Sequence, residues 1–325
     1  MISTILKGAA MGVAEVIPGV SGGTIAFITG IYERLLNCIK AVGPSLISTF
    51  REDGFGAVWK KLDGNFLALL LVGMLGGIVT GIFGVTYLLE EYPTPVWGFF
   101  FGLIIASSIY IAKQIPKWDA SKWIGLFVGF AVAYGITVIT PAEGSDSLVM
   151  VFIAGAIAIC ALILPGISGS FMLLLMGMYT LIIPSLKSLL KEQDMASFTI
   201  VVVFALGCLV GLTGFSRVLT WLLKEYKYTT FAVLTGFMMG SLNKIWPWRN
   251  ITEVMDKESG VTTKLFESKD ALSLPADSYK ILTEANVLPQ AYEMGEPLLI
   301  ITFVSALVGF LSVFLLERAN KSNPK

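Results

Sequence analysis

Long apolar segments alternate with short polar connections along most of the chain. A helix needs about 20 predominantly apolar residues to cross the hydrocarbon core of a bilayer. Uninterrupted segments of this kind predict spanning helices at about 65–89, 94–113, 122–140, 198–223, 229–246 and 297–316. The pattern therefore indicates an all-α polytopic membrane protein.

Two further apolar segments are interrupted by proline, glycine and serine. The first interruption covers residues 15–24 (EVIPGVSGGT), and the second covers residues 164–170 (LPGISGS). A bilayer core accommodates irregular backbone only where protein or a water-filled cavity supplies hydrogen bonds, so both breaks should face one or the other. We interpret the surrounding segments, 5–40 and 148–186, as re-entrant helical hairpins. A fully spanning hairpin is the alternative, and either form returns the chain to its starting side.

The two breaks belong to an internal repeat. Residues around the breaks match at an offset of 147, as in Gly8/Gly155, Ala9/Ala156, Gly30/Gly177 and Tyr32/Tyr179. The spans that follow match at an offset of 134, as in Gly73/Gly207, Gly77/Gly211, Glu91/Glu225, Gly102/Gly236 and Ser107/Ser241. Each half, 1–140 and 141–325, then holds one broken re-entrant hairpin and three transmembrane helices. Three crossings separate the hairpins, which predicts two inverted-topology repeats whose breaks meet at a transporter substrate site.

Basic residues in short loops set the orientation, because cytoplasmic loops carry an excess of Lys and Arg. With the N-terminus inside, most of these residues are cytoplasmic, namely Lys7, Arg34, Lys40, Arg51, Lys60, Lys61, Lys113, Lys117, Lys122, Lys224, Lys227, Arg318, Lys321 and Lys325. Lys187 and Lys191 are exceptions. Both termini are predicted to be cytoplasmic. The polar stretch at about 247–296 becomes a large outer loop, expected to contain some helix and to cap the outer mouth.

Composition narrows the possible functions mainly by exclusion. Hydrophobic residues make up 55% of the chain and charged residues 14%, against about 25% charged in soluble domains. The formal net charge is zero, without a long basic or acidic block, so no nucleic-acid partner is expected. The absence of histidine removes Ser-His triads and HExxH zinc sites, and the three cysteines lack metal-like spacing. Most membrane enzymes are therefore poor candidates, and we expect a protein that is not an enzyme and that holds no metal and no cofactor.

The breaks supply the candidate substrate site. Ser21 and Ser168 each follow a Pro-Gly-aliphatic tripeptide and stand where the N-cap of the next helix belongs. Glycines after each serine should leave first-turn amides uncovered, and such a helix end binds carboxylate or phosphate. The expected breaks are at Pro18, Gly19, Pro165 and Gly166, and the expected anion-binding residues are Ser21, Gly22, Gly23, Thr24, Ser168, Gly169 and Ser170. The alternative is that these small residues permit close helix crossing.

Three charged residues complete the candidate site. Glu15 lies just before the first break, where a carboxylate costs about 2.5–3.5 kcal/mol on insertion scales and usually faces a functional cavity. It would couple transport to protons or cap the broken backbone. Arg217 lies in the apolar run 201–223 and would bind a substrate phosphate or snorkel to the interface. Lys244 lies at the outer interface beside Trp246 and Trp248, where it would receive an anionic lipid headgroup or serve only as an interfacial residue.

The sequence resembles the DUF368 family of bacterial membrane proteins. The resemblance rests on residues 14–24 (AEVIPGVSGGT), 164–170 (LPGISGS) and 240–247 (GSLNKIWP), and it covers nearly the whole chain. It implies a flippase that returns undecaprenyl phosphate, or another polyprenyl phosphate, from the outer to the inner leaflet of the cytoplasmic membrane for reuse. The isoprenoid tail of such a lipid can stay in the bilayer, so the protein would need to shield only the phosphate. Polyprenyl phosphate and membrane lipids are thus the expected partners.

Two alternative functions remain from the residues alone. Helix ends that bind anions would serve a small water-soluble anion equally well, which leaves a small-anion transporter or channel open. A membrane enzyme that processes a lipid phosphate is the second alternative, because Ser and Asp nucleophiles do not require histidine. Lipid competition and release of phosphate would distinguish these alternatives from a lipid carrier.

Overall fold

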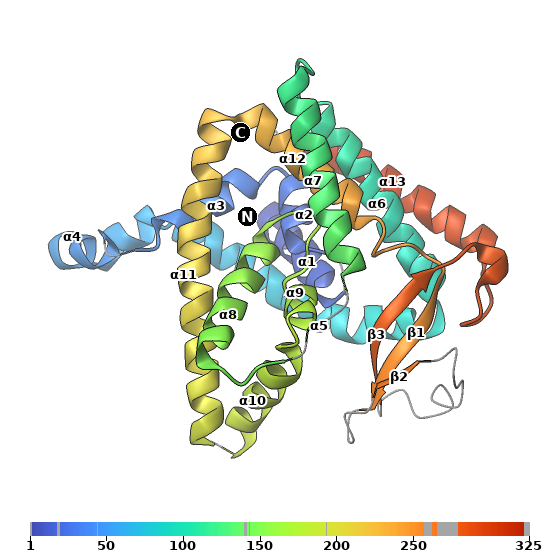
Figure 1. Ribbon diagram of the computed structural model, residues 1–325. Coiled ribbons are helices and arrows are strands. Elements are labelled where there is room, and N and C mark those ends of the chain that lie inside the picture. Colours follow the sequence, from blue (N-terminus) through green and yellow to red (C-terminus); the bar gives the residue numbers. More distant parts are fainter. Residues whose placement is uncertain are drawn as a thin grey trace.

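The computed structural model describes residues 2–17, 20–43, 45–139, 142, 144–192, 194–256, 262–264 and 279–321 (Figure 1). The first half contains α1 (Ile2–Val16), α2 (Gly22–Ile28), α3 (Tyr32–Ala41), α4 (Ser45–Lys61), α5 (Gly64–Glu91), α6 (Pro93–Ala112) and α7 (Ala120–Val138). The second half contains α8 (Leu148–Ile163), α9 (Gly169–Leu175), α10 (Tyr179–Glu192), α11 (Met195–Glu225), α12 (Lys227–Ser241), β1 (Arg249–Asp256), β2 (Thr262–Lys264), β3 (Tyr279–Asn286), a short 3-10 helix (Pro289–Ala291) and α13 (Leu299–Lys321).

Four helices of the described chain, α5, α6, α7 and α11, are long and apolar enough to cross a membrane. The pair α9 and α10 is bent by 119° and counts as a fifth candidate if it forms one span. Helices α8 and α13 are apolar but shorter. The predicted spans at 65–89, 94–113, 122–140 and 198–223 are therefore confirmed, and the chain is a multi-pass helical membrane protein.

Helix α12 is shorter than the predicted span at 229–246. It ends at Ser241, and turns follow before Pro247. Proline disfavours helical backbone at the residue before it and supplies no N–H of its own. The WPW sequence is thus incompatible with a helix that continues to residue 246, and β1 begins directly after it at Arg249.

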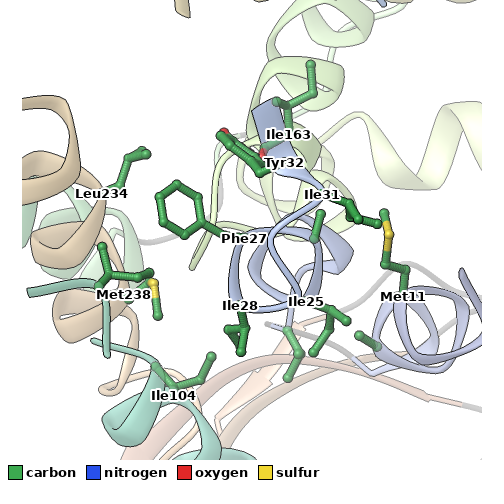
Figure 2. Close-up of a cluster of buried hydrophobic side chains, with 14 of the residues drawn as sticks. Met11, Ile25, Phe27, Ile28, Ile31, Tyr32, Ile104, Ile163, Leu234 and Met238 are labelled. Atoms are coloured by element: carbon green, nitrogen blue, oxygen red, sulfur yellow. Dashed lines mark hydrogen bonds between the residues drawn. The ribbon is translucent and has the colours of Figure 1, made fainter. Parts of the chain in front are cut away.

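Helix α2 lies at the centre of the main hydrophobic core (Figure 2). All seven of its residues are buried. Phe27 contacts Phe231 of α12 edge to face, with ring centroids 5.2 Å apart, and also contacts Tyr32 of α3. Ile17 and Val20, on either side of the first break, are 1% and 2% exposed. The described residues on either side of this break are therefore enclosed by protein, one of the two environments predicted for it.

The internal repeat extends to the packing of the helices. A Cβ atom at Gly8 would meet the carbonyl oxygen of Leu70, and one at Gly155 would meet that of Phe204. Both the glycines and their contacts are equivalent at the offsets found in the sequence. The same holds for two further pairs of contacts, Gly73–Ile5 with Gly207–Phe152 and Gly77–Ala9 with Gly211–Ala156. Gly102 and Gly236 are also equivalent, and they meet Ala306 and Leu126 respectively. These glycines let α1 approach α5, α8 approach α11, α6 approach α13, and α7 approach α12 closely.

The predicted outer loop folds as an antiparallel sheet in the order β2-β1-β3, so the expectation of helix in its described part is wrong apart from the short 3-10 helix. Pairs include Arg249 with Asn286 and Val254 with Ile281. β-Branched residues, which suit a pleated and half-buried surface, are frequent in β1 and β3. The parts of the loop at 257–261 and 265–278 lie outside the described residues.

Candidate functional site

Ser21 caps α2 and ties it to the second hairpin. The N–H of Gly23 donates to Ser21 Oγ at 3.0 Å, as predicted for an N-cap. The Ser21 hydroxyl in turn donates to the carbonyl oxygen of Leu162, at the end of α8, at 3.0 Å. Ser21 is 1% exposed. The serine therefore uses both its acceptor and its donor inside the protein.

The side-chain carboxylate of Glu15, near the end of α1, lies at the N-terminus of α2. The N–H of Gly22 donates to Glu15 Oε1 at 2.7 Å, and the N–H of Thr24 donates to the Ser21 carbonyl oxygen at 3.0 Å. At the other end of the helix, Lys7 Nζ donates to the carbonyl oxygen of Thr29 at 2.8 Å. A negative group at the N-terminus and a positive group at the C-terminus both match the helix dipole. This is the geometry expected of Glu15 as a structural cap, and its proton-coupling role stays a prediction.

The first-turn amides of α2 are not uncovered. Gly22, Gly23 and Thr24 each donate to an acceptor of the protein, because a buried N–H without an acceptor is costly. The expectation of free amides is therefore wrong for the conformation seen here. Pro18 and Gly19, the expected break residues, lie outside the described residues. The substrate role of the neighbouring residues stays a prediction.

The second break lies directly against the first. The N–H of Gly166 donates to Thr24 Oγ1 at 3.0 Å, and the hydroxyl of Tyr32 donates to the carbonyl oxygen of Ile163 at 3.2 Å. Gly166 has φ of +87°, and a Cβ there would meet the backbone of Met238. Only glycine suits both the conformation and the space. The two breaks therefore contact each other, with Pro165 buried beside them. Their entry from opposite faces and their role as a substrate site stay predictions.

Ser168 does not cap α9 as predicted. Its backbone is extended, as at an N-cap, but its side chain makes no cap hydrogen bond. The Ser168 and Ser170 hydroxyls lie 3.0 Å apart and bond to each other, which diverts the cap oxygen from the helix amides. Gly169 packs against the carbonyl oxygen of Ala158 on α8. The two breaks are therefore similar in sequence but different in hydrogen bonding.

Arg217 is separate from the breaks in this structure. It lies exposed on α11, and its guanidinium is next to Gly43 in the loop after α3. Among the described residues it makes no hydrogen bond or ion pair to either break. The structure therefore does not join Arg217 to Ser21 and Ser168.

Lys244, in contrast, lies beside the second hairpin. Its Nζ donates to Glu284 Oε2 of β3 at 3.1 Å and lies 4.8 Å from the ring centroid of Phe171 on α9. A cavity of about 300 Å³ adjoins Lys244 and is lined by the end of α7, by α9, by the turn after α12 and by β3. Asn243, which lines the same cavity, donates to Thr137 Oγ1 at 2.7 Å. The cavity thus connects the sheet with the helix that follows the second break.

Sequence reasoning missed Arg249, the first residue of β1. Its Nη1 donates to Glu284 Oε2 at 2.8 Å and to the Lys244 carbonyl oxygen at 2.9 Å, and its guanidinium lies 4.2 Å from the ring centroid of Trp97. The side chain is 8% exposed. Its position directly after the WPW sequence was the available signal, but a charged residue is ordinary in a polar loop.

Opposite charges stabilise this cluster in the ionised state. Burial alone would raise the pKa of Glu284, but attraction to Arg249 and Lys244 holds that pKa below its ordinary value of 4.5. Burial lowers the pKa of Arg249 although Glu284 opposes this. Two cations surround one anion, so the cluster carries a net positive charge next to the cavity. Among the described residues, no group of His, Cys, Asp or Glu is suited to holding a metal ion.

The fold and the site together define a class of protein. The chain has apolar helices that can span a membrane and two helix breaks that contact each other in the protein interior. A multi-pass membrane protein shields irregular backbone from lipid in this way. A family model described as VCA0040-like, undecaprenyl phosphate translocase-like, matches residues 11–263. The chain belongs to this family, the DUF368 family.

Two relatives agree with this assignment. A polyprenyl-phosphate transporter of Vibrio cholerae is 44% identical over 266 residues, which cover 82% of this chain and 84% of the relative. A polyprenyl-phosphate transporter of Staphylococcus aureus is 32% identical over 257 residues, which cover 75% of this chain and 85% of the relative. No solved structure matches the chain. Both relatives are named as transporters, and this chain accordingly belongs to a class of transporters and not of enzymes.

Proposed function

We propose that this protein carries polyprenyl phosphate, such as undecaprenyl phosphate, from the outer to the inner leaflet of the bacterial cytoplasmic membrane. Family membership and the names of two relatives support the lipid substrate. The structural observation that carries the proposal is the hydrogen bond between Gly166 and Thr24, which brings the two helix breaks together in the protein interior. Interrupted segments at equivalent positions of two halves mark the substrate site of many secondary transporters.

The repeats take inverted topology in this proposal, and both termini are cytoplasmic. The hairpins then enter from opposite faces, and the sheet caps the outer side. The duplicated glycine contacts support a two-fold relationship between the halves. Each hairpin would open to its own face in turn, which is alternating access around a fixed site.

The substrate phosphate first enters the cavity beside Lys244 and then passes along the residues of the breaks. There it replaces the Glu15 carboxylate on the N–H of Gly22, since both ligands are anions that accept from the same helix end. Ser21, Gly23, Thr24, Ser168, Gly169 and Ser170 line this path, and Arg217 receives the phosphate near the cytoplasmic face. Protonation of Glu15 weakens its hold on Gly22 and couples movement of the lipid to the proton gradient.

Leaflet-resolved transport in proteoliposomes tests this function. Purified protein is reconstituted with a fluorescent polyprenyl phosphate, and the fraction in each leaflet is followed with a quencher on one side, with and without a pH gradient. We expect transbilayer movement of polyprenyl phosphate and none of the uncharged polyprenol. Transport of soluble anions without competition from polyprenyl phosphate would contradict the proposal in favour of a small-anion carrier. Released inorganic phosphate would instead indicate an enzyme.

A further inference from the structure

Arg249, the buried first residue of β1, has a side-chain N–H that donates to no described acceptor. Its side chain is 8% exposed, yet its Nε–H has no acceptor among the residues that the structure describes. Burying a polar group without a partner costs stability, and native proteins seldom do so without a reason. The neighbouring Nη1 already serves Glu284 and the Lys244 carbonyl oxygen. Nη1 of the guanidinium is thus engaged, while Nε has no acceptor in the described part of the chain.

Two cavities meet at this arginine. The cavity of about 300 Å³ beside α9 has a mixed lining, with the polar residues Lys244, Asn243 and Thr283 and the apolar residues Phe171 and Leu175. A second cavity of about 640 Å³ lies toward the junction of α5 and α6, and its lining combines the apolar side chains of Leu89, Trp97 and Ile281 with the acidic residues Glu90 and Glu293. Arg249 and Glu284 line both cavities. The ion pair therefore lies between a smaller cavity of mixed lining and a larger, more apolar one.

We infer that Arg249 and Lys244 form a binding site for the phosphate monoester of a lipid on the outer side of the protein. Glu284 binds both cations when no lipid is bound, and the phosphate displaces it. This inference rests on the proposed function and names the first contact of its substrate. The phosphate occupies the smaller cavity beside Lys244, and the first isoprene units occupy the apolar side of the larger cavity. Arg249 and Lys244 are binding residues in this arrangement, and Glu284 is an internal competitor.

The chemistry of the cluster fits a phosphate better than it fits Glu284. A guanidinium binds two oxygens of one phosphate side by side, with Nε and one Nη as donors. Glu284 instead presents a single oxygen, Oε2, to both Arg249 Nη1 and Lys244 Nζ. A phosphate monoester carries about −1.5 to −2 charge at neutral pH and three acceptor oxygens. It can therefore reach the unused Nε and Lys244 together, and it neutralises two cations more fully than one carboxylate does.

A purely structural ion pair is the competing explanation. In that case Glu284 and Arg249 would only fix β3 and β1 against the turn after α12. Such a role predicts that loss of Glu284 and loss of Arg249 both lower the stability of the protein and, with it, the affinity for the ligand. The inferred binding site predicts opposite effects on ligand affinity, because one partner binds the phosphate and the other competes with it.

Binding measurements on the full-length protein in nanodiscs test the inference. The probes are a short-chain polyprenyl phosphate, the matching polyprenol and inorganic phosphate. We expect Arg249→Lys to weaken binding of the polyprenyl phosphate about tenfold or more, since lysine keeps the charge but loses the fork. We expect Glu284→Gln to tighten it severalfold, because glutamine is the same size but no longer competes as an anion. Arg249→Lys also retains a cation opposite Glu284, which limits damage to the fold.

Arg34 offers a matched control. It pairs with Asp63 at 2.6 Å and lies 4.2 Å from the ring centroid of Phe66, so it has the same kinds of partner as Arg249. Arg34→Lys should leave binding of polyprenyl phosphate unchanged. Size-exclusion profiles and melting temperatures of all variants show whether the fold is retained.

Each outcome decides between the explanations. Wild-type affinity in Arg249→Lys, or weaker binding in Glu284→Gln, overturns the inference. Equal affinity for inorganic phosphate and the lipid identifies free phosphate as the ligand and also overturns it. If wild-type protein transports polyprenyl phosphate while Arg249→Lys binds it normally, the inferred binding site is wrong and the proposed function stands. If the wild type does not transport the lipid, the proposed function itself fails.

Discussion

Gly166 donates its backbone N–H to the side-chain oxygen of Thr24 at 3.0 Å, across 142 residues of chain. One residue comes from the break before α9 and the other from the first turn of α2, so this bond joins the two irregular segments directly. Thr24 is fully buried. The bond is therefore shielded from bulk solvent, and its loss should affect both hairpins.

Replacing Thr24 by valine removes this acceptor with little change in shape. The buried N–H of Gly166 is then left unsatisfied, which should lower the free energy of unfolding by about 1–3 kcal/mol. Thermal denaturation in detergent measures the effect. Thr24→Ser should retain most of the stability, because serine keeps the hydroxyl. Thr80→Val is the matched control, since Thr80 is exposed and bonds only to its own helix. Equal stability of Thr24→Val and wild type would mean that the contact contributes nothing.

Substitution of Gly166 by alanine should be more damaging. Its φ of +87° lies in the left-handed region, where a Cβ alone costs about 1–2 kcal/mol. The added methyl group would also press on the backbone of Met238, which cannot turn away as a flexible side chain can. We expect low yield of folded protein in size-exclusion chromatography. Gly84→Ala should fold normally, because a Cβ at Gly84 meets nothing. Normal folding of both variants would show that the second break is free to move away from α12.

Glu15→Gln separates the two roles of Glu15. The glutamine side-chain oxygen can still accept from the N–H of Gly22, so the cap on α2 and the fold should remain. A glutamine cannot exchange a proton, however, and the dependence of transport on the pH gradient should disappear. Transport in proteoliposomes at several pH gradients measures this. Glu33→Gln serves as the control, because Glu33 forms a half-exposed pair with Lys227. A gradient dependence equal to wild type in Glu15→Gln would leave only the structural cap.

The attachment of the sheet should weaken in acid. Arg249 and Lys244 hold the pKa of Glu284 below its ordinary value of 4.5, so the ionised form is favoured in the folded protein. A depressed pKa contributes stability above the ordinary value, and that stability is lost as the pH falls through 4.5 and below the folded pKa. Limited proteolysis of the sheet with an acid-active protease measures this, with cleavage increasing below about pH 4.5. Glu284→Gln should reduce the pH dependence. An identical pH profile in that variant would assign the effect to other carboxylates.

The hydrophobic pattern was sufficient to predict the spanning helices α5, α6, α7 and α11, because length and apolar content decide whether a helix can cross a bilayer. The cap at Ser21 was also predictable, since an N-cap depends on a few neighbouring residues. The offsets between equivalent glycines were visible in the sequence as well. All of these features are local, or they are copies of a local pattern.

Tertiary structure alone decided which partners the charged and polar residues would take. Glu15 could serve the backbone or a cavity, and the fold places it on Gly22. Ser168 stands in the same sequence context as Ser21 but bonds to Ser170. Arg249 and Glu284 meet because β1 and β3 pair across a long loop whose sequence favoured no single partner. Hydrophobic periodicity and helix-capping signals depend on neighbouring residues, so they can be found in the sequence. These contacts depend on how distant segments pack, so only the folded chain determines them.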